Sequence, residues 1–382
     1  MEPNGDFVTA SNVLVIGQRI NKSRVWKLGD LTLAEVNDYK YLGSHIERSL
    51  TDNFHINTFL DSKNKRLKNM FTLTLSKHLN VKRISFGTEM YKTQYLPSIL
   101  HGCCLWTLNT KKSIAKLRSF QYNIGKTILN IGCKPAMESI LGDLGWEDIY
   151  FEVVKRQVNF FIYLMTLPEH CLMKKLYNTM LHKFERGQKT SWGYVQSMQD
   201  TLIKIGYKGL RDDVDNISKT YKKQIDKVTA QEFKNNVLSK STLCLYSSLI
   251  KERGLQKYLK KDFEFEGSRL KFLARVGRFK LRTETSHWEN NSVSENCEWC
   301  PNEPETIQHR LLICPHFNDA RKIFFSNVNK LDFNIISKFL SSTDTVKLCW
   351  ILGDEAFCVG GQEIGIIFDT YVKRFLKDVF IN

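Results

Sequence analysis

The sequence predicts a mainly α-helical protein with a small antiparallel β-sheet near its N-terminus. Three observations support this fold class: short β-branched runs in residues 12–50, helical spacing of apolar residues over most of the remaining chain, and a Cys- and His-containing loop at residues 291–320. Hydrophobic residues make up 42% and charged residues 25% of the 382 residues, which is a globular composition. A chain of this length suits one very large domain or roughly two to three ordinary ones.

The N-terminal region has the pattern of short strands. Residues 1–11 are polar, and we expect them to be disordered. From Asn12 onward, mostly β-branched apolar residues and alternating segments follow one another, and Gly29 with Asp30 is a turn signal between two of them. Residues 12–50 are therefore predicted to form three or four antiparallel strands.

Helical spacing takes over after Asp52. The apolar stretch from Gly87 to Trp106 contains Pro97, which predicts a kinked or broken buried helix. Further helices are predicted over Lys111–Ile131 and over Trp146–Leu167, before Pro168. The helical regions that we expect are residues 51–190, a connecting region at 191–290 and a C-terminal region of two or three helices at 321–382.

The charge of the chain favours a polyanionic partner. Its 56 Lys and Arg residues exceed its 40 Asp and Glu residues by 16, which is most simply explained by nucleic-acid binding; the alternative is a solvated basic surface. The excess is concentrated between Phe54 and Arg118, where 12 basic residues face only two acidic ones. Lys63, Lys65, Arg66 and Lys68 form the densest part of this stretch.

Membrane insertion and secretion are not indicated. No apolar run approaches the roughly 18–20 residues that a spanning helix needs, and the N-terminus lacks a basic segment followed by an apolar one. We therefore expect an intracellular protein that does not contact a membrane. Ten cysteines are too few for a disulfide scaffold in a chain of this length, so clustered cysteines indicate metal ligands or core thiols.

One cysteine cluster has the spacing of a metal site. Cys297 and Cys300 can clamp an ion from one tight turn, and His309 with Cys314 can complete a tetrahedron. Three thiolates and one imidazole leave no open coordination position, which predicts one structural Zn²⁺ rather than a catalytic one. His316 is an alternative ligand. The three cysteines could also be ordinary core thiols, but their polar sequence neighbours disfavour that interpretation.

Two further features near this cluster suggest contact with nucleic acid. Trp299 lies between the first two ligands, where it could stack on an unpaired base or cover the metal core. Spacings of 4, 3 and 4 predict that Lys271, Arg275, Arg278 and Arg282 share one basic face of a helix within residues 269–282. The alternative for these four residues is a solvated helix face.

Four segments, in order, carry a resemblance to a known family. Val36–Gly43 resembles the YLG motif that follows the palm of non-LTR (LINE-type) retrotransposon reverse transcriptases. Tyr91–Trp106, with Pro97 and Gly102, is similar to the "Y…P…YG…W" stretch of the thumb, and Gly142–Trp146 is similar to a common "lGelGW" element. Cys297–Cys314 resembles the CCHC zinc knuckle near the C-terminus of these proteins.

The resemblance covers roughly residues 12–380 and implies a division of the chain. It implies palm-end β-hairpins at 12–50, a helical thumb-like region at 51–190, a connector at 191–290, a knuckle at 291–320 and a C-terminal helical cap at 321–382. These parts of the family grip template RNA and the primer duplex, which implies RNA or an RNA/DNA duplex as the partner, and nucleus or cytoplasm as the compartment. Tyr39 and Tyr41 match the hairpin motif, although one of them could instead fill the core of the sheet.

The catalytic half of the family is not matched. Polymerases of this kind hold two metal ions with palm carboxylates, whereas Asp212-Asp213, the single Asp-Asp pair, follows the YLG motif and lies in a polar context. We therefore expect a nucleic-acid-binding C-terminal fragment without RNA-directed DNA polymerase activity of its own. One alternative is part of an active polymerase whose catalytic half is encoded upstream or supplied by another chain. The other is a zinc-stabilised adaptor between proteins.

Overall fold

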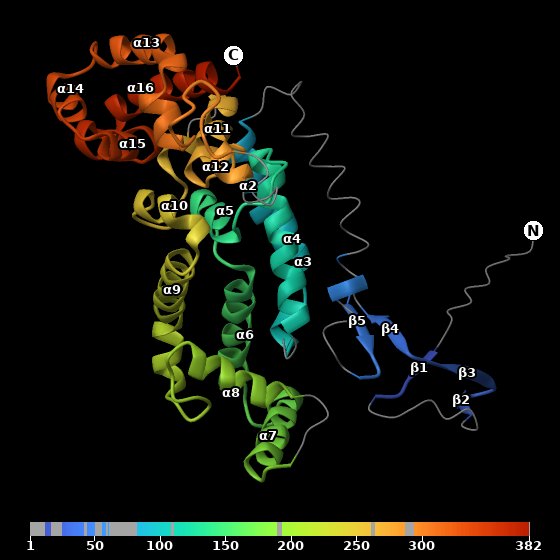
Figure 1. The fold of residues 1–382 in the computed structure, drawn as a ribbon. Coiled ribbons are helices and arrows are strands. Elements are labelled where there is room, and N and C mark those ends of the chain that lie inside the picture. The colour runs from blue at the N-terminus through green and yellow to red at the C-terminus, as the bar shows by residue number, and fades with distance from the viewer. Residues whose placement is uncertain are drawn as a thin grey trace, which may run out of the picture. The chain divides into compact units, whose positions relative to one another are not determined.

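Helices dominate the computed structural model of the chain, as the sequence predicted (Figure 1). The predicted disordered segment 1–11 lies outside the described residues. No helix in the described part combines the length and apolarity needed to cross a bilayer. The structure describes residues 12–16, 25–41, 44–49, 56–58, 60, 82–107, 111–188, 193–260, 264–286 and 294–381.

The chain divides into two units, each assembled from separate stretches of sequence. The first unit comprises Met1–Asn69, Gln94–Phe120 and Ile149–Val228, and the second comprises Met70–Thr93, Gln121–Asp148 and Thr229–Asn382. The division falls within the long helices α4 (Lys111–Leu129) and α9 (Val214–Leu238), so each of these helices contributes residues to both units. The segment boundaries that we predicted from the sequence stay predictions.

Five short strands lie near the N-terminus. In the three-stranded sheet, β3 is central and pairs antiparallel with β2 through the predicted two-residue turn at Gly29 and Asp30, where Gly29 has φ of +61°. A separate antiparallel hairpin joins β4 to β5. The strands are β1 (Asn12–Leu14), β2 (Trp26–Leu28), β3 (Leu31–Val36), β4 (Asp38–Tyr41) and β5 (Ser44–Glu47).

The predicted antiparallel arrangement is wrong for β1. This strand pairs in parallel with β3, with Asn12 opposite Ala34 and Leu14 opposite Val36. The error has a physical reason, because side chains alternate between the two faces of a strand whichever way its neighbour runs. An alternating pattern therefore predicts a strand without giving its direction.

The first unit has a helical core built around α6 (Ile149–Thr166). Phe151, Val154, Val158 and Phe161 follow spacings of 3, 4 and 3, so they share one buried face of this helix. That face belongs to one apolar cluster with residues of α7, α8 and α9. The remaining elements of this unit are α3 (Leu96–Ile99), η2 (Cys103–Leu105), α7 (Leu172–Glu185) and α8 (Tyr194–Lys204).

The distortion predicted around Pro97 is present as a π-helical turn within a helical stretch that runs from Arg83 to Ile99. Helix α2 (Arg83–Met90) passes into a π-helical turn, η1 (Tyr91–Tyr95), before α3 begins with Pro97 in its first turn. The π-helical turn accommodates the proline, whose ring nitrogen cannot donate to a carbonyl of the preceding turn. Gly102 then takes a left-handed conformation with φ of +71° at the start of η2.

The second unit contains most of the shorter helices and a C-terminal helical bundle. In this bundle, α16 packs against α11 and α13, and aromatic rings such as Phe324 and Phe375 stack in its core at a centroid distance of 4.8 Å. Four helices, α13 to α16, form the C-terminal region instead of the predicted two or three (Figure 1). The helices are α5 (Met137–Leu144), α10 (Cys244–Leu249), α11 (Phe265–Arg275), α12 (Arg282–Thr285), α13 (Asn318–Val328), α14 (Phe333–Leu340), α15 (Asp344–Leu352) and α16 (Glu355–Phe380), and the short turns are η3 (Ser241–Leu243), η4 (Lys257–Leu259), η6 (His309–Ile313) and η7 (Pro315–Phe317).

Helix α11 is shorter than the sequence predicted. It ends at Arg275, and Gly277 follows with φ of +61°. The N–H of Arg278 then donates to the carbonyl of Leu273 at 3.0 Å, which closes the helix as a Schellman motif. Arg278 and Arg282 therefore lie beyond the helix, and the prediction of one continuous basic face over residues 269–282 is wrong.

Gly145 ends α5 in a position that no other residue fits. Its φ is +66°, and a methyl group added there would lie 2.3 Å from the backbone nitrogen of Leu255. We expect Gly145→Ala to lower the free energy of unfolding by about 1 kcal/mol for the left-handed backbone and by roughly 1–3 kcal/mol more for the steric overlap. Denaturant titration of the variant measures this loss.

Gly277→Ala is the matched control for that substitution. Gly277 has a similar φ of +61°, but the nearest atom to an added methyl group is Glu284 Oε1 at 3.5 Å, an ordinary contact. The control therefore carries the backbone strain without the overlap. Equal losses of stability in the two variants would contradict the packing argument for Gly145.

Candidate metal centre

The four predicted ligands meet in one small module. A short hairpin holds Cys297 and Cys300: the N–H of Cys297 donates to the carbonyl of Glu303 at 2.8 Å, and the N–H of Glu303 donates to that of Cys300 at 3.0 Å. His309 opens the η6 turn, and the N–H of Cys314 donates to the carbonyl of His309 at 2.7 Å. Local backbone hydrogen bonds therefore fix the two turns that carry the four ligands.

The distances within the cluster suit a single metal ion. All four ligand atoms lie within 4.8 Å of one another, and Cys314 Sγ lies 3.8 Å from Cys297 Sγ and 3.9 Å from Cys300 Sγ. Thiolates placed tetrahedrally at the usual Zn–S distance of about 2.3 Å would be about 3.8 Å apart. The four side chains are therefore close enough together to bind one metal ion.

The imidazole of His309 gives an independent reason to expect an ion. Its side chain is buried, and neither ring nitrogen has a hydrogen-bond partner among the described residues. A buried polar atom without a partner is costly, because it has lost its bond to water without replacement. A metal–nitrogen bond would satisfy one of the two nitrogens. Among the predicted ligands, His309 belongs to the cluster and His316 does not.

Burial also sets the protonation state of the Cys314 thiol. The apolar surroundings raise the pKa of Cys314 to about 11, so without a metal this thiol is protonated at neutral pH. Metal binding to such a site releases a proton.

The buried guanidinium of Arg321 donates to the carbonyls of Leu311 and Cys314, and thereby attaches the module to α13.

Glu305 anchors the hairpin on its other side. This carboxylate is buried and accepts hydrogen bonds from the N–H of Arg282 at 2.9 Å and from the Arg310 guanidinium at 3.0 Å. The backbone carbonyl of Glu305 accepts a further bond from Thr283 at 2.7 Å. The metal module is therefore attached to α12 through the carboxylate and the backbone carbonyl of Glu305, whose role the sequence did not reveal.

Trp299 lies at the surface of the module. The indole is 42% exposed and stacks on the His316 ring at a centroid distance of 3.9 Å, with Phe317 against its edge. His316 thus covers one face of the indole. The two interpretations of Trp299, a lid over the metal core and a platform for a base, both remain compatible with this geometry.

Of the four basic residues that were predicted to share one helix face within residues 269–282, two are buried. Lys271 and Arg275 are only 1% and 0% exposed, so the interpretation of these residues as surface contacts for nucleic acid is wrong. The Lys271 ammonium lies 2.8 Å from the Asp369 carboxylate, and the Arg275 guanidinium lies 3.2 Å from that of Asp143. Their helical spacing was predicted correctly, but it places them on the inner face of α11.

Asp143 is the centre of a fully buried polar network. One of its oxygens accepts hydrogen bonds from Arg275 and from Tyr246 at 2.9 Å, and the other accepts one from Tyr258 at 2.5 Å. Burial, followed by the charge of Asp143, raises the pKa of both tyrosines well above the ordinary value. The Arg275 guanidinium also donates to the carbonyl of Leu352 at 2.6 Å.

Asp369 forms a second buried network with two lysines. Its carboxylate lies 2.8 Å from both Lys271 and Lys373, and Lys373 also donates to the carbonyl of Tyr258. Burial lowers the pKa of Lys271, and the Asp369 charge opposes that shift. A signal for both networks existed in the sequence, because Asp143 and Asp369 are single charges within apolar helical stretches.

The other predicted site residues divide between described and undescribed parts of the chain. Tyr39 and Tyr41 are both exposed on β4, so neither fills the core of the sheet. Arg278 and Arg282 are half-buried, and Arg282 lies 3.9 Å from Glu298. The predicted contacts Lys63, Lys65, Arg66 and Lys68 lie outside the described residues.

The Asp212-Asp213 pair has a local structural role. Asp213 caps α9, because its carboxylate accepts hydrogen bonds from the N–H groups of Asp215 and Asn216 at 3.1 and 3.3 Å. The carboxylate of Asp212 accepts a bond from the N–H of Lys208. Both side chains therefore bind backbone of their own loop.

Compared with family models, curated proteins and solved structures, the chain gives no significant match.

Proposed function

We propose that this chain is an RNA-binding or more generally nucleic-acid-binding protein, related to the C-terminal part of LINE-type reverse transcriptases, that acts by binding rather than by catalysis. The observation that carries the proposal is the net charge of +16, with 12 basic and two acidic residues between positions 54 and 118. A cationic stretch of this kind attracts phosphates and releases their condensed counterions.

We further propose that the Cys₃His cluster holds one structural zinc ion. Thiolate and imidazole are the ligands that Zn²⁺ takes in closed tetrahedral sites, and the sulfur–sulfur distances support this geometry. Cys297, Cys300, His309 and Cys314 would supply the whole coordination sphere. The ion would contribute folding energy to the module, because four protein ligands leave no position for a substrate.

Binding of single-stranded RNA should weaken steeply as salt is added. Fluorescence anisotropy across a salt series measures the slope of log K against log salt concentration, which changes by roughly 0.7 for each phosphate contact. Joint replacement of the basic cluster by Ala should flatten this slope by roughly 0.7 per lost contact. The cluster consists of Lys63, Lys65, Arg66 and Lys68.

A control variant removes the same charge elsewhere. Its four substituted residues are exposed on α13, α14, α16 and the loop after α13, in the C-terminal segment whose charge is nearly balanced. This variant should keep the wild-type slope. A slope of log K against log salt concentration that is flat in the wild type, or equal in both variants, would refute the proposed binding of phosphates by the basic cluster. The control residues are Lys322, Lys330, Lys338 and Arg374.

Trp299→Ala separates the two interpretations of that side chain. Loss of base stacking should weaken RNA binding by about 1–3 kcal/mol, whereas loss of a lid should leave RNA affinity unchanged and reduce the stability of the module. Anisotropy and metal retention, measured on the same sample, report the two effects separately. The half-exposed indole makes the variant compatible with folding.

The polymerase alternative has its own assay. Mg²⁺-dependent primer extension by the chain, alone or with a separate catalytic subunit, would contradict the proposal of binding without catalysis and would support RNA-directed DNA polymerase activity.

The adaptor alternative is favoured by one observation, namely exposed apolar side chains on the C-terminal helices, including Phe333 at 78% and Ile323 at 58%. Absence of nucleic-acid binding at low salt would favour it over the main proposal.

A further inference from the structure

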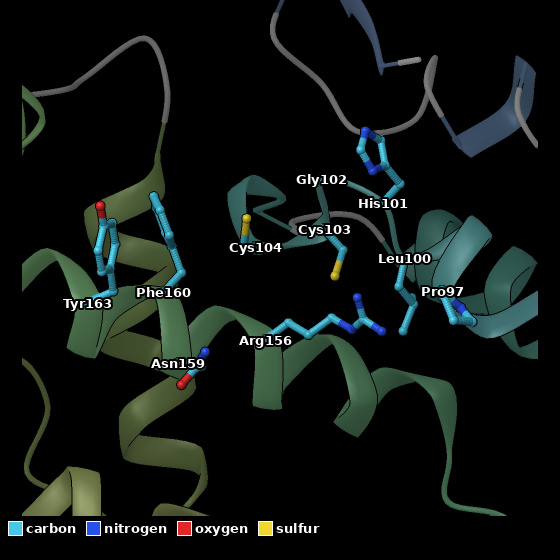
Figure 2. Close-up of a pocket in the computed structure, with 10 residues that line it drawn as sticks. All are labelled: Pro97, Leu100, His101, Gly102, Cys103, Cys104, Arg156, Asn159, Phe160 and Tyr163. Carbon is cyan, nitrogen blue, oxygen red and sulfur yellow. The ribbon is translucent and has the colours of Figure 1, made fainter. Parts of the chain in front are cut away.

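An open cleft of about 420 Å³ lies within the first unit, between α6 and the segment that contains α3 and η2 (Figure 2). Its volume falls within the range of small-molecule sites, roughly 300–1,000 Å³. The wall formed by Pro97 to Cys104 belongs to the Tyr91–Trp106 motif that the sequence had singled out. The residues that matter for its chemistry are His101, Cys104, Arg156, Asn159, Phe160 and Tyr163.

The cleft carries a positive charge, that of Arg156, and no acidic residue lines it among the described residues. Arg156 makes no ion pair within the described part of the chain. The preceding residue, Lys155, lies 3.9 Å from both Glu152 and Asp226. Figure 2 shows the Arg156 side chain extending along the cleft beneath Cys103.

The thiols of the cleft do not supply the missing anion. Burial raises the pKa of Cys103 to about 12 and also raises the pKa of Cys104, so both remain neutral at physiological pH. The guanidinium of Arg156 therefore keeps its full hydrogen-bonding capacity for a ligand. A guanidinium prefers carboxylate or phosphate oxygens, which it can bind in a bidentate manner.

Aromatic side chains line the other end of the same cleft, and the Arg156 guanidinium extends away from them toward Leu100 (Figure 2). Arg156, Phe160 and Tyr163 follow spacings of 4 and 3, and the two ring centroids are 6.2 Å apart. Tyr163 is 50% exposed, and Asn159 offers an exposed amide on the neighbouring turn. Arg156, Asn159, Phe160 and Tyr163 all line this one cleft, so a nucleotide that lies along it can contact the cation with its phosphate and a ring with its base.

We propose that this cleft binds one nucleotide, with its phosphate at Arg156 and its base against Phe160 or Tyr163. Stacking on aromatic rings is how proteins hold unpaired bases, and Asn159 can donate to or accept from the edge of a base. The nucleotide is either free or one residue of a single strand. The polymer case rests on the proposed function, and the free-nucleotide case stands without it.

The test uses the full chain and two probes. Adenosine monophosphate represents the free nucleotide and is followed by calorimetry; a fluorescent ten-residue oligoadenylate represents the single strand and is followed by anisotropy. Each of two variants should weaken the affinity for whichever probe the wild type binds by about 10- to 100-fold. Arg156→Ala loses charge-assisted hydrogen bonds to the phosphate, and Tyr163→Ala loses stacking on the base. Arg156→Lys should recover part of the affinity, because it keeps the charge without the planar fork.

Lys155→Ala is the matched control. It removes the same charge from the preceding position of the same helix, where the side chain pairs with Glu152 and Asp226. It should bind both probes like the wild type. Arg156-dependent binding of either probe supports the cleft and identifies the source of the nucleotide.

Three other outcomes are decisive. Oligoadenylate binding that is equal in the wild type, Arg156→Ala and Tyr163→Ala, without adenosine monophosphate binding, overturns the cleft and leaves the proposed function intact. Adenosine monophosphate binding that depends on Arg156, without any oligoadenylate binding, supports the cleft and refutes the proposed function. Failure of both probes to bind the wild type overturns both.

Discussion

Removal of the metal should unfold the Cys₃His module while the first unit stays folded. A structural zinc ion contributes on the order of 10 kcal/mol to the module that it organises, and residues 294–317 bury little besides the ligands and a few apolar side chains. Treatment with a chelator should therefore abolish amide protection throughout this segment. Hydrogen-exchange mass spectrometry, with peptides from α6 and α8 as internal references, measures the change.

A pair of histidine variants makes this prediction specific. His309→Ala removes a ligand, so it should reduce bound zinc far below one ion per chain and expose the segment to exchange. His316→Ala is the matched control, because His316 lies two residues beyond Cys314 and stacks on Trp299 without joining the cluster. Elemental analysis that shows full zinc in His309→Ala, or loss of zinc in His316→Ala only, would contradict the assigned ligand set.

Asp143→Ala should destabilise the second unit more than any surface substitution. Asp143 and Arg275 are both 0% exposed, so the variant would leave a guanidinium buried without its counter-ion and two tyrosine hydroxyls without their acceptor. Breaking a buried ion pair in this way costs about 3–5 kcal/mol. Chemical denaturation of the variant, followed by tryptophan fluorescence, measures the loss.

A double variant distinguishes the destabilisation caused by an unpaired buried charge from that caused by altered packing. Asp143→Leu combined with Arg275→Met replaces both charges by apolar groups, and should recover much of the stability that Asp143→Ala loses. Asp319→Ala is the surface control, because its partner Lys322 is 68% exposed and such pairs contribute roughly 0–1 kcal/mol. An Asp143→Ala variant as stable as Asp319→Ala would show that the buried network is not structurally important.

The metal cluster could be predicted because its information is local. Cys297 and Cys300 share one turn, and His309 and Cys314 share the next, so the spacing along the chain already encodes most of the geometry. The turn at Gly29 and the helix distortion near Pro97 were predictable for the same reason. In each case a few neighbouring residues determine the backbone that the structure adopts.

The burial of Lys271 and Arg275 could not be predicted because their partners are remote. Asp369 lies 98 residues after Lys271, and Asp143 lies 132 residues before Arg275. A helical wheel shows only that the two cations share a face, and it cannot show what covers that face. The glycine at position 277 was the one available signal that the helix would end before Arg278 and Arg282.

The pairing direction of β1 and the composition of the two units were hidden for a related reason. Both depend on contacts between segments that are distant in sequence, as with Asn12 opposite Ala34 or α5 beside the loop that contains Leu255. Nucleic-acid binding through Lys63, Lys65, Arg66 and Lys68 stays a prediction, as does the role of Trp299.

The location of Asp369 makes the second unit sensitive to truncation. This carboxylate lies on α16, yet it neutralises Lys271, 98 residues earlier in the chain. A chain that stops before position 369 would leave the Lys271 ammonium without its carboxylate, in an interior that α16 no longer covers. We therefore expect such a chain to lose the packing of its second unit, although it keeps all four residues of the metal cluster.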